Sequence, residues 1–336
     1  MRRYERVVFG APAFGVLALA LALGSLPAGA RRRPVPTPTP APTAVPAPTA
    51  TPLSEAARME RLRGELDVVA REAPGKLGIA VTELTGNFRY TVHADDAFGL
   101  ADLAKLPVAL AAYRRADQKR LDLDARVVVT RGDLRRAPSE IASAHPNGGA
   151  SYAYWELLRA TVVYADSTAA DLLWRALGGP SEVNRLLRRL HVHDLTLRST
   201  EAERATAARA HRTSAQGGDN AATPAGFADF LAGIARQDYT LLDSTNELLL
   251  ALDAAQAGAT RVGAGLPKAV RFAHLSTTSS TLDGVTDATN DAGLLTLPDG
   301  RRIAVAAFLG PSQADEAKRD ATFARVGRAL AAAYVP

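Results

Sequence analysis

Three short segments of the chain carry side chains that could do proton-transfer or acyl-transfer chemistry. In the first, Asp102-Leu-Ala-Lys105, a carboxylate and an amine three residues apart share one face of a helix. The second, residues 164–170 (Tyr-Ala-Asp-Ser-Thr-Ala-Ala), lies between two stretches of helical periodicity. The third, residues 272–278 (Phe-Ala-His-Leu-Ser-Thr-Thr), carries its hydroxyls on an expected strand. For the first segment we predict an Asp102–Lys105 ion pair at the floor of a cleft, favoured by the positive end of the helix dipole.

A mixed α/β body must bring these segments together. Alternation with period two in residues 78–84 and 88–92, around a Thr-Gly-Asn turn, predicts a hairpin. Helical periodicity predicts helices at 54–71 (with Ser54 as N-cap), 103–119, 152–163, 168–177, 180–190, 224–235, 243–257 and 313–334. Late strands are expected at 270–275, 293–297 and 303–309, whereas residues 194–222 are expected to be irregular. Two early and three late strands around a helical middle predict one sheet closed by both ends of the body.

In order, spacing and context, the three segments resemble the class A β-lactamase and penicillin-binding protein superfamily. That superfamily places Ser-x-x-Lys at a helix start, Ser-Asp-Asn on a loop between helices and Lys-Thr-Gly on a strand. Residues 260–267 and 289–295 also look like the family's stretches around that strand, and the resemblance covers residues 54–334. It implies an α/β fold with a five-stranded antiparallel sheet, flanked by helices, and an inserted all-helical subdomain.

Several catalytic residues of that family are replaced by other residue types in this chain. Asp102 stands in place of the nucleophilic Ser, Ala165 in place of the proton-relaying Ser, and Leu275 in place of the Lys that attracts the substrate carboxylate. Counting along the sequence without gaps places Glu201 at the position of the family's deacylating Glu. Ala205 then stands in place of the Asn that helps to hold the deacylating water. The family positions fall, in chain order, at Asp102, Lys105, Ala165, Asp166, Ser167, Glu201, Leu275, Ser276 and Thr277.

These differences predict a site without catalytic competence, because acyl transfer needs an uncharged nucleophile that can lose a proton. The resemblance then implies a pseudoenzyme that acts as a binding or scaffolding module of the cell envelope, with peptidoglycan fragments or an envelope protein as partner. The alternative is an active hydrolase of the same superfamily with a rearranged site, in which Asp102, Lys105, Asp166 and Glu201 act. A third possibility is a structural envelope domain with a vestigial cleft.

Ligand contacts outside the motif positions are expected at Arg261 and Thr278. Arg261 lies where some members of the family carry a clamping Arg, although a surface Arg would fit the sequence as well. His191-x-His193 would point two imidazoles the same way on a strand, but no third ligand is placed beside them. We therefore expect no metal, and the lack of a phosphate-binding or dinucleotide fingerprint predicts no cofactor.

Composition excludes several classes of protein. The chain has 336 residues and no cysteine, which excludes a disulfide framework, thiolate metal sites and a Cys nucleophile. The formal net charge is +5, but residues 1–33 hold six arginines and one acid. Removing them from 40 basic and 35 acidic residues leaves 34 of each, so the body is neutral and a nucleic-acid partner is not expected.

The N-terminal part of the sequence is typical of an exported protein. Basic residues precede an apolar run, residues 7–26, and Ala28-Gly29-Ala30 has the form of a signal-peptidase site. The run is also long enough to anchor the chain in a membrane, so residues 1–33 are expected to be a signal peptide or a membrane anchor. Residues 34–52 are expected to form a Pro/Thr-rich linker of extended chain, and residues 53–336 are expected to form the β-lactamase-like domain. The body is expected outside the cytoplasm, either secreted or periplasmic, or anchored to the cytoplasmic membrane.

Overall fold

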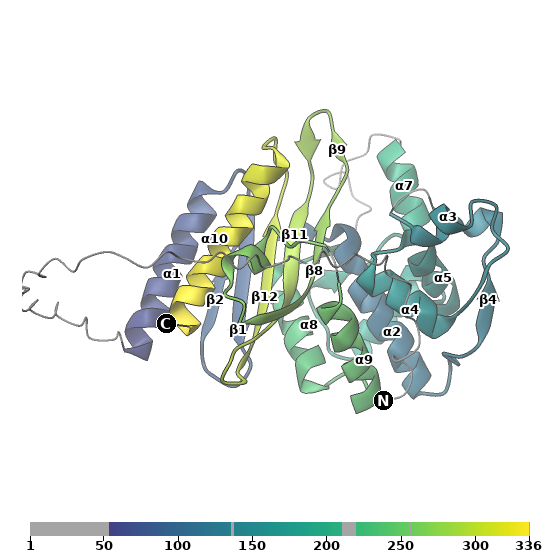
Figure 1. The fold of residues 1–336 in the computed structure, drawn as a ribbon, viewed down its shortest axis with the longest axis horizontal. Coiled ribbons are helices and arrows are strands. Elements are labelled where there is room, and N and C mark those ends of the chain that lie inside the picture. Colours follow the sequence, from purple (N-terminus) through teal and green to yellow (C-terminus); the bar gives the residue numbers. More distant parts are fainter. Residues whose placement is uncertain (1–53, 136–137, 210–219, 256, 336) are drawn as a thin grey trace, which may run out of the picture. The chain divides into compact units, whose positions relative to one another are not determined.

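The five-stranded antiparallel sheet is the frame of the body in the computed structural model, which describes residues 54–135, 138–209, 220–255 and 257–335 (Figure 1). Its strands lie in the order β2 (Arg89–Val92), β1 (Leu77–Glu83), β12 (Arg302–Leu309), β11 (Thr289–Thr296) and β8 (Arg271–Thr278). β1 pairs with β12 along its whole length, so the two ends of the body close one sheet. The predicted fold class is confirmed.

Two helices cover one face of the sheet, α1 (Glu55–Glu72) and α10 (Glu316–Tyr334) (Figure 1). The Ser54 hydroxyl accepts a hydrogen bond from the Ala57 N–H, as predicted, and starts α1. Successive side chains of β1 point to opposite faces of the sheet. Ile79 belongs to the core beneath α1 and α10, and Ala80 belongs to the core on the other side of the sheet.

The opposite face of the sheet packs against helices, including the buried helix α8 (Pro224–Arg236) (Figure 1). The remaining helices lie on the same side of the sheet as α8, and they are α2 (Lys105–Asp117), α3 (Glu140–Ala144), α4 (Tyr154–Val163), α5 (Ser167–Leu177), α6 (Gly179–Arg189), α7 (Glu201–Arg209) and α9 (Leu242–Asp253). The short strands are β3 (Phe98–Gly99), β4 (Arg126–Val128), β5 (Ser151–Ala153), β6 (Leu195–Thr196), β7 (Ala221–Ala222), β9 (Thr281–Leu282) and β10 (Val285–Thr286). Single turns of 3₁₀ helix lie at Ala101–Ala104, Arg131–Asp133 and Val262–Gly265.

The structure corrects two predictions of local structure. Residues 194–222 are not wholly irregular, because α7, β6 and β7 lie within them. The Thr200 hydroxyl and the Glu203 carboxylate form a capping box at the start of α7, a local signal that the sequence already contained. The helix expected from residue 103 begins at Lys105, since the preceding four residues form a 3₁₀ turn.

The predicted division of the chain lies partly outside the described residues. Both the signal or anchor, residues 1–33, and the Pro/Thr-rich linker, residues 34–52, fall there, and these boundaries stay predictions. From Ser54 onward the described residues belong to one compact unit. None of the helices in the described ranges combines the length and apolar composition needed to cross a bilayer.

Candidate functional site

Four charged side chains meet where α2 begins. Lys105 Nζ lies 3.1 Å from Asp102 Oδ1, which confirms the predicted ion pair, and 3.8 Å from Glu201 Oε2. Arg204, one turn along α7 from Glu201, donates to Asp102 Oδ1 at 3.1 Å and to Glu201 Oε2 at 3.0 Å. Two cations and two carboxylates therefore neutralise one another, and we call these four residues the charge cluster.

The charge cluster has an inner and an outer side. The side chains of Lys105 and Glu201 are 1% and 6% exposed, whereas those of Asp102 and Arg204 are each 20% exposed. Charges withdrawn from water interact more strongly than charges at a surface, because the surrounding dielectric is lower. Lys105 and Glu201 therefore lie where proton transfer is best shielded from solvent.

Asp102 stays ionised in this setting. Burial opposes its charge, but the cations of Lys105 and Arg204, which also hydrogen-bond to it, lower the pKa of Asp102 to about 2. The carboxylate is therefore an anion at neutral pH and is fully engaged with the two cations.

We expect the low pKa of Asp102 to make the protein less stable in acid. A carboxyl group whose pKa falls on folding stabilises the folded state above its unfolded pKa, and this contribution is lost as the pH falls through the folded pKa. The advantage of the native chain over Asp102→Asn should therefore shrink by about 2 kcal/mol between about pH 5 and pH 2. Chemical denaturation of both proteins across that range measures it. A constant difference would mean that Asp102 is not held in the ion pair.

The loop before α5 supplies the next contacts. The Ala165 carbonyl accepts a hydrogen bond from Lys105, and Ala165 has a left-handed backbone (φ +51°). Asp166, which is fully buried, caps α5 through the Ala169 N–H at 2.8 Å and holds the neighbouring helix through the Ile141 N–H at 3.0 Å. Asp166 therefore fixes the loop and orients the Ala165 carbonyl, and it does not contact Lys105.

Ser167 is the first residue of α5 and lies inside the charge cluster. Its Oγ accepts a hydrogen bond from Lys105 Nζ at 3.2 Å and donates one to Glu201 Oε2 at 3.3 Å. The residue is 3% exposed. A hydroxyl thus bridges the amine and the carboxylate.

The three family-motif residues on β8, which are Leu275, Ser276 and Thr277, differ in their surroundings. The Thr277 hydroxyl accepts a hydrogen bond from the Asp102 N–H at 3.3 Å and so ties the sheet to the turn before α2. Leu275 is buried in the apolar core on the helical side. Ser276 packs against the backbone of Gly258, where an added Cβ would lie 1.9 Å from its Oγ. Of the three, Thr277 is the one with a hydrogen bond to the charge-cluster segment.

Arg261 is a buried structural residue and not a surface one. Its guanidinium pairs with Asp320 at 2.8 Å and donates to the carbonyls of Thr277 at 2.8 Å and Asn290 at 2.9 Å. It also donates to the hydroxyl of Thr278. Most of its N–H groups therefore join β8, β11 and α10, and a ligand-binding role for Arg261 and Thr278 stays a prediction.

The histidine prediction is wrong in its geometry. His191 and His193 follow α6 in a loop, and His191 has a left-handed backbone (φ +57°) instead of a strand conformation. Among the described residues, no three His, Asp or Glu side chains gather in a way that could hold a metal ion.

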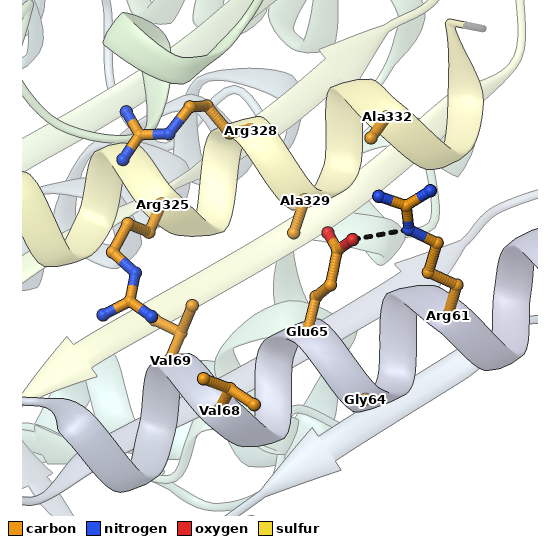
Figure 2. Close-up of a pocket in the computed structure, with 9 residues that line it drawn as sticks. All are labelled: Arg61, Gly64, Glu65, Val68, Val69, Arg325, Arg328, Ala329 and Ala332. Carbon is orange, nitrogen blue, oxygen red and sulfur yellow. Dashed lines mark hydrogen bonds and ion pairs between the residues drawn. The ribbon is translucent and has the colours of Figure 1, made fainter.

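Sequence reasoning missed Arg204 as a member of the charge cluster. Its three-residue spacing from Glu201 was the available signal, because such spacing puts two side chains on one helix face. A groove of about 710 Å³ lies elsewhere, between α1 and α10 (Figure 2). Arg61 pairs there with Glu65 at 2.7 Å, and the groove contains none of the predicted site residues.

Comparison with known proteins identifies relatives of this chain and of its fold. The model of the β-lactamase enzyme family matches residues 61–334. β-Lactamase VEB-1 of Pseudomonas aeruginosa is 25% identical over 76% of this chain and 85% of its own length. Extended-spectrum β-lactamase PER-1 of the same organism is 26% identical over 81% and 87%. The crystal structure of a β-lactamase from Chitinophaga pinensis superposes with a TM-score of 0.75 and 29% identity, over 80% of this chain and 97% of that one.

These relatives contradict the prediction that the chain is a pseudoenzyme. They are named as β-lactamases, which points to an enzyme. The prediction is wrong for a physical reason: replacing three motif residues does not remove the chemistry of the side chains that pack around them. Lys105, Glu201 and a hydroxyl nevertheless meet in the folded chain.

Proposed function

The chain belongs to the β-lactamase enzyme family, and on that premise we propose that it is an active hydrolase of the β-lactamase and DD-peptidase superfamily with a rearranged site. Its substrates are compounds with a strained or activated amide or ester carbonyl, such as β-lactams and peptidoglycan fragments. We further propose that it acts outside the cytoplasm, as its N-terminal sequence predicts.

The single observation that carries this proposal is the burial of Lys105 against Glu201 and Asp102. Withdrawing charges from water costs several kcal/mol per ion, and apolar side chains of similar volume often stabilise a fold at least as well. A purely structural core would not need these charges. Active sites are places where charged side chains are characteristically buried against one another.

The geometry supports a distinct role for each residue. Glu201, with its carboxylate inside the cluster, takes the proton of an attacking hydroxyl group. Lys105 donates hydrogen bonds and stabilises the negative charge that develops during attack. Asp102 holds Lys105 in place, and Asp166 acts further out by fixing the loop of Ala165 and Ser167.

A substrate panel tests this function. We expect the full chain to turn over at least one of three compounds: a penicillin, a chromogenic cephalosporin or a peptide that ends in D-alanyl-D-alanine. The double variant Asp102→Ala with Lys105→Met serves as the inactive reference, and Glu60→Gln on exposed α1 as the control expected to match the native rate. Absorbance and product mass measure turnover. Native rates no higher than those of the double variant for all three compounds would refute the proposal.

A further inference from the structure

The position of Ser167 between an amine and a carboxylate carries an inference that rests on the proposed hydrolase function. We propose that Ser167 is the nucleophile of this chain and that it forms the covalent acyl-enzyme, in place of residue 102. The substrate class is the same, an amide or ester carbonyl, and the new assignment concerns the atom that attacks it.

Asp102 is poorly suited to this role. It is an anion whose Oδ1 accepts hydrogen bonds from both Lys105 and Arg204. A carboxylate held by two cations attacks a carbonyl weakly, and the product of its attack would be a labile anhydride. Asp102 therefore orients Lys105 instead of reacting.

Ser167 has the contacts of an activated hydroxyl. An effective serine nucleophile needs a base within hydrogen-bond reach and a third group that orients the pair. Here Glu201 Oε2 lies 3.3 Å from Ser167 Oγ on the accepting side, and Lys105 Nζ lies 3.2 Å away on the donating side. Arg204 donates to both oxygens of Glu201 and fixes its carboxylate.

The surrounding backbone also favours negative charge on Ser167 Oγ. Ser167 is the first residue of α5, an eleven-residue helix, so the positive end of the helix dipole lies at its side chain. Asp166, as the cap, and the left-handed Ala165 fix the entry to this helix. The hydroxyl is therefore pre-positioned by the same loop that holds Lys105.

The two half-reactions balance with the residues present. Ser167 Oγ bonds to the carbonyl carbon, and the proton of the hydroxyl passes to the Glu201 carboxylate. The carbon–nitrogen or carbon–oxygen bond of the substrate then breaks, and the leaving nitrogen or oxygen takes the proton from Glu201. Water next attacks the ester on Ser167, giving one proton to Glu201. The ester bond breaks, and Ser167 Oγ recovers the proton. Lys105 remains an ammonium ion and stabilises each developing anion.

Ser167 lies deeper in the protein than Asp102 and Arg204. Ser167 is 3% exposed, whereas the side chains of Asp102 and Arg204 are each 20% exposed. A substrate therefore meets Asp102 and Arg204 first, and acylation requires these two side chains to part.

Peptide mapping after acylation tests this assignment. The full chain is incubated with benzylpenicillin or p-nitrophenyl acetate, quenched in acid, digested and analysed by mass spectrometry. We expect the added mass on the peptide that contains Ser167. Ser167→Ala should lose the adduct and at least about 10²-fold in kcat, with KM and the melting temperature little changed, and Ser167→Cys should regain an adduct.

Ser181→Ala is the matched control, because Ser181 is an exposed serine in the first turn of another helix, α6. It should behave as the native chain does. An adduct on Asp102, or turnover that survives Ser167→Ala, would overturn the assignment and leave the hydrolase function standing. A native chain that neither forms an adduct nor turns over any substrate would overturn both.

Discussion

Replacing Lys105 by methionine should lower the free energy of unfolding by about 3–5 kcal/mol, because it strands buried negative charge. Without Lys105 the charge cluster holds two carboxylates and one cation, and Glu201 is almost wholly buried. The side chain of Met fills most of the same space, so the loss is mainly electrostatic. Chemical denaturation at neutral pH, with the midpoint and slope compared with those of the native chain, measures the change.

The matched control is the double variant Lys105→Met with Asp102→Ala. It leaves one carboxylate and one cation, Glu201 and Arg204, and should therefore be more stable than the single variant. A double variant that is less stable than Lys105→Met alone would show that the charge balance does not govern this part of the core.

Replacing Glu201 by glutamine should lower kcat by about 10²–10⁴-fold on any substrate that the native chain hydrolyses, because a side-chain amide cannot accept the proton. Gln keeps the shape and can still accept a hydrogen bond from Arg204, so KM should change little. Steady-state kinetics of the native and variant chains separate the two constants.

The control for this change is Glu60→Gln, the same substitution at an exposed position of α1. It should retain native kinetics. A Glu201→Gln variant that keeps the native kcat would remove Glu201 from the proton-transfer step, and the proposed mechanism would have to be abandoned.

The sequence by itself determined the sheet and most of the helices. Period-two alternation in β2 and the apolar periodicity of α1 and α10 follow from which side chains must be buried on each element, whereas β1 is buried on both faces. These patterns are local, so they could be read without knowing the neighbours of each element. The Asp102–Lys105 pair was predictable for the same reason, because three-residue spacing at a helix start already brings the two side chains together.

Only the tertiary structure decided what surrounds that pair. Ser167 and Glu201 reach Lys105 because α5 packs against α2 and α7 packs against α5, and no periodicity within one segment encodes such a contact. The burial of Arg261 has the same origin, since Asp320 on α10 and the carbonyls of two strands accept its hydrogen bonds. Considered one at a time, the replaced motif residues Asp102, Ala165 and Leu275 favour an inactive site. Hydrogen bonds between distant segments, which form only when the helices pack on the sheet, instead placed an amine, a carboxylate and a hydroxyl in contact.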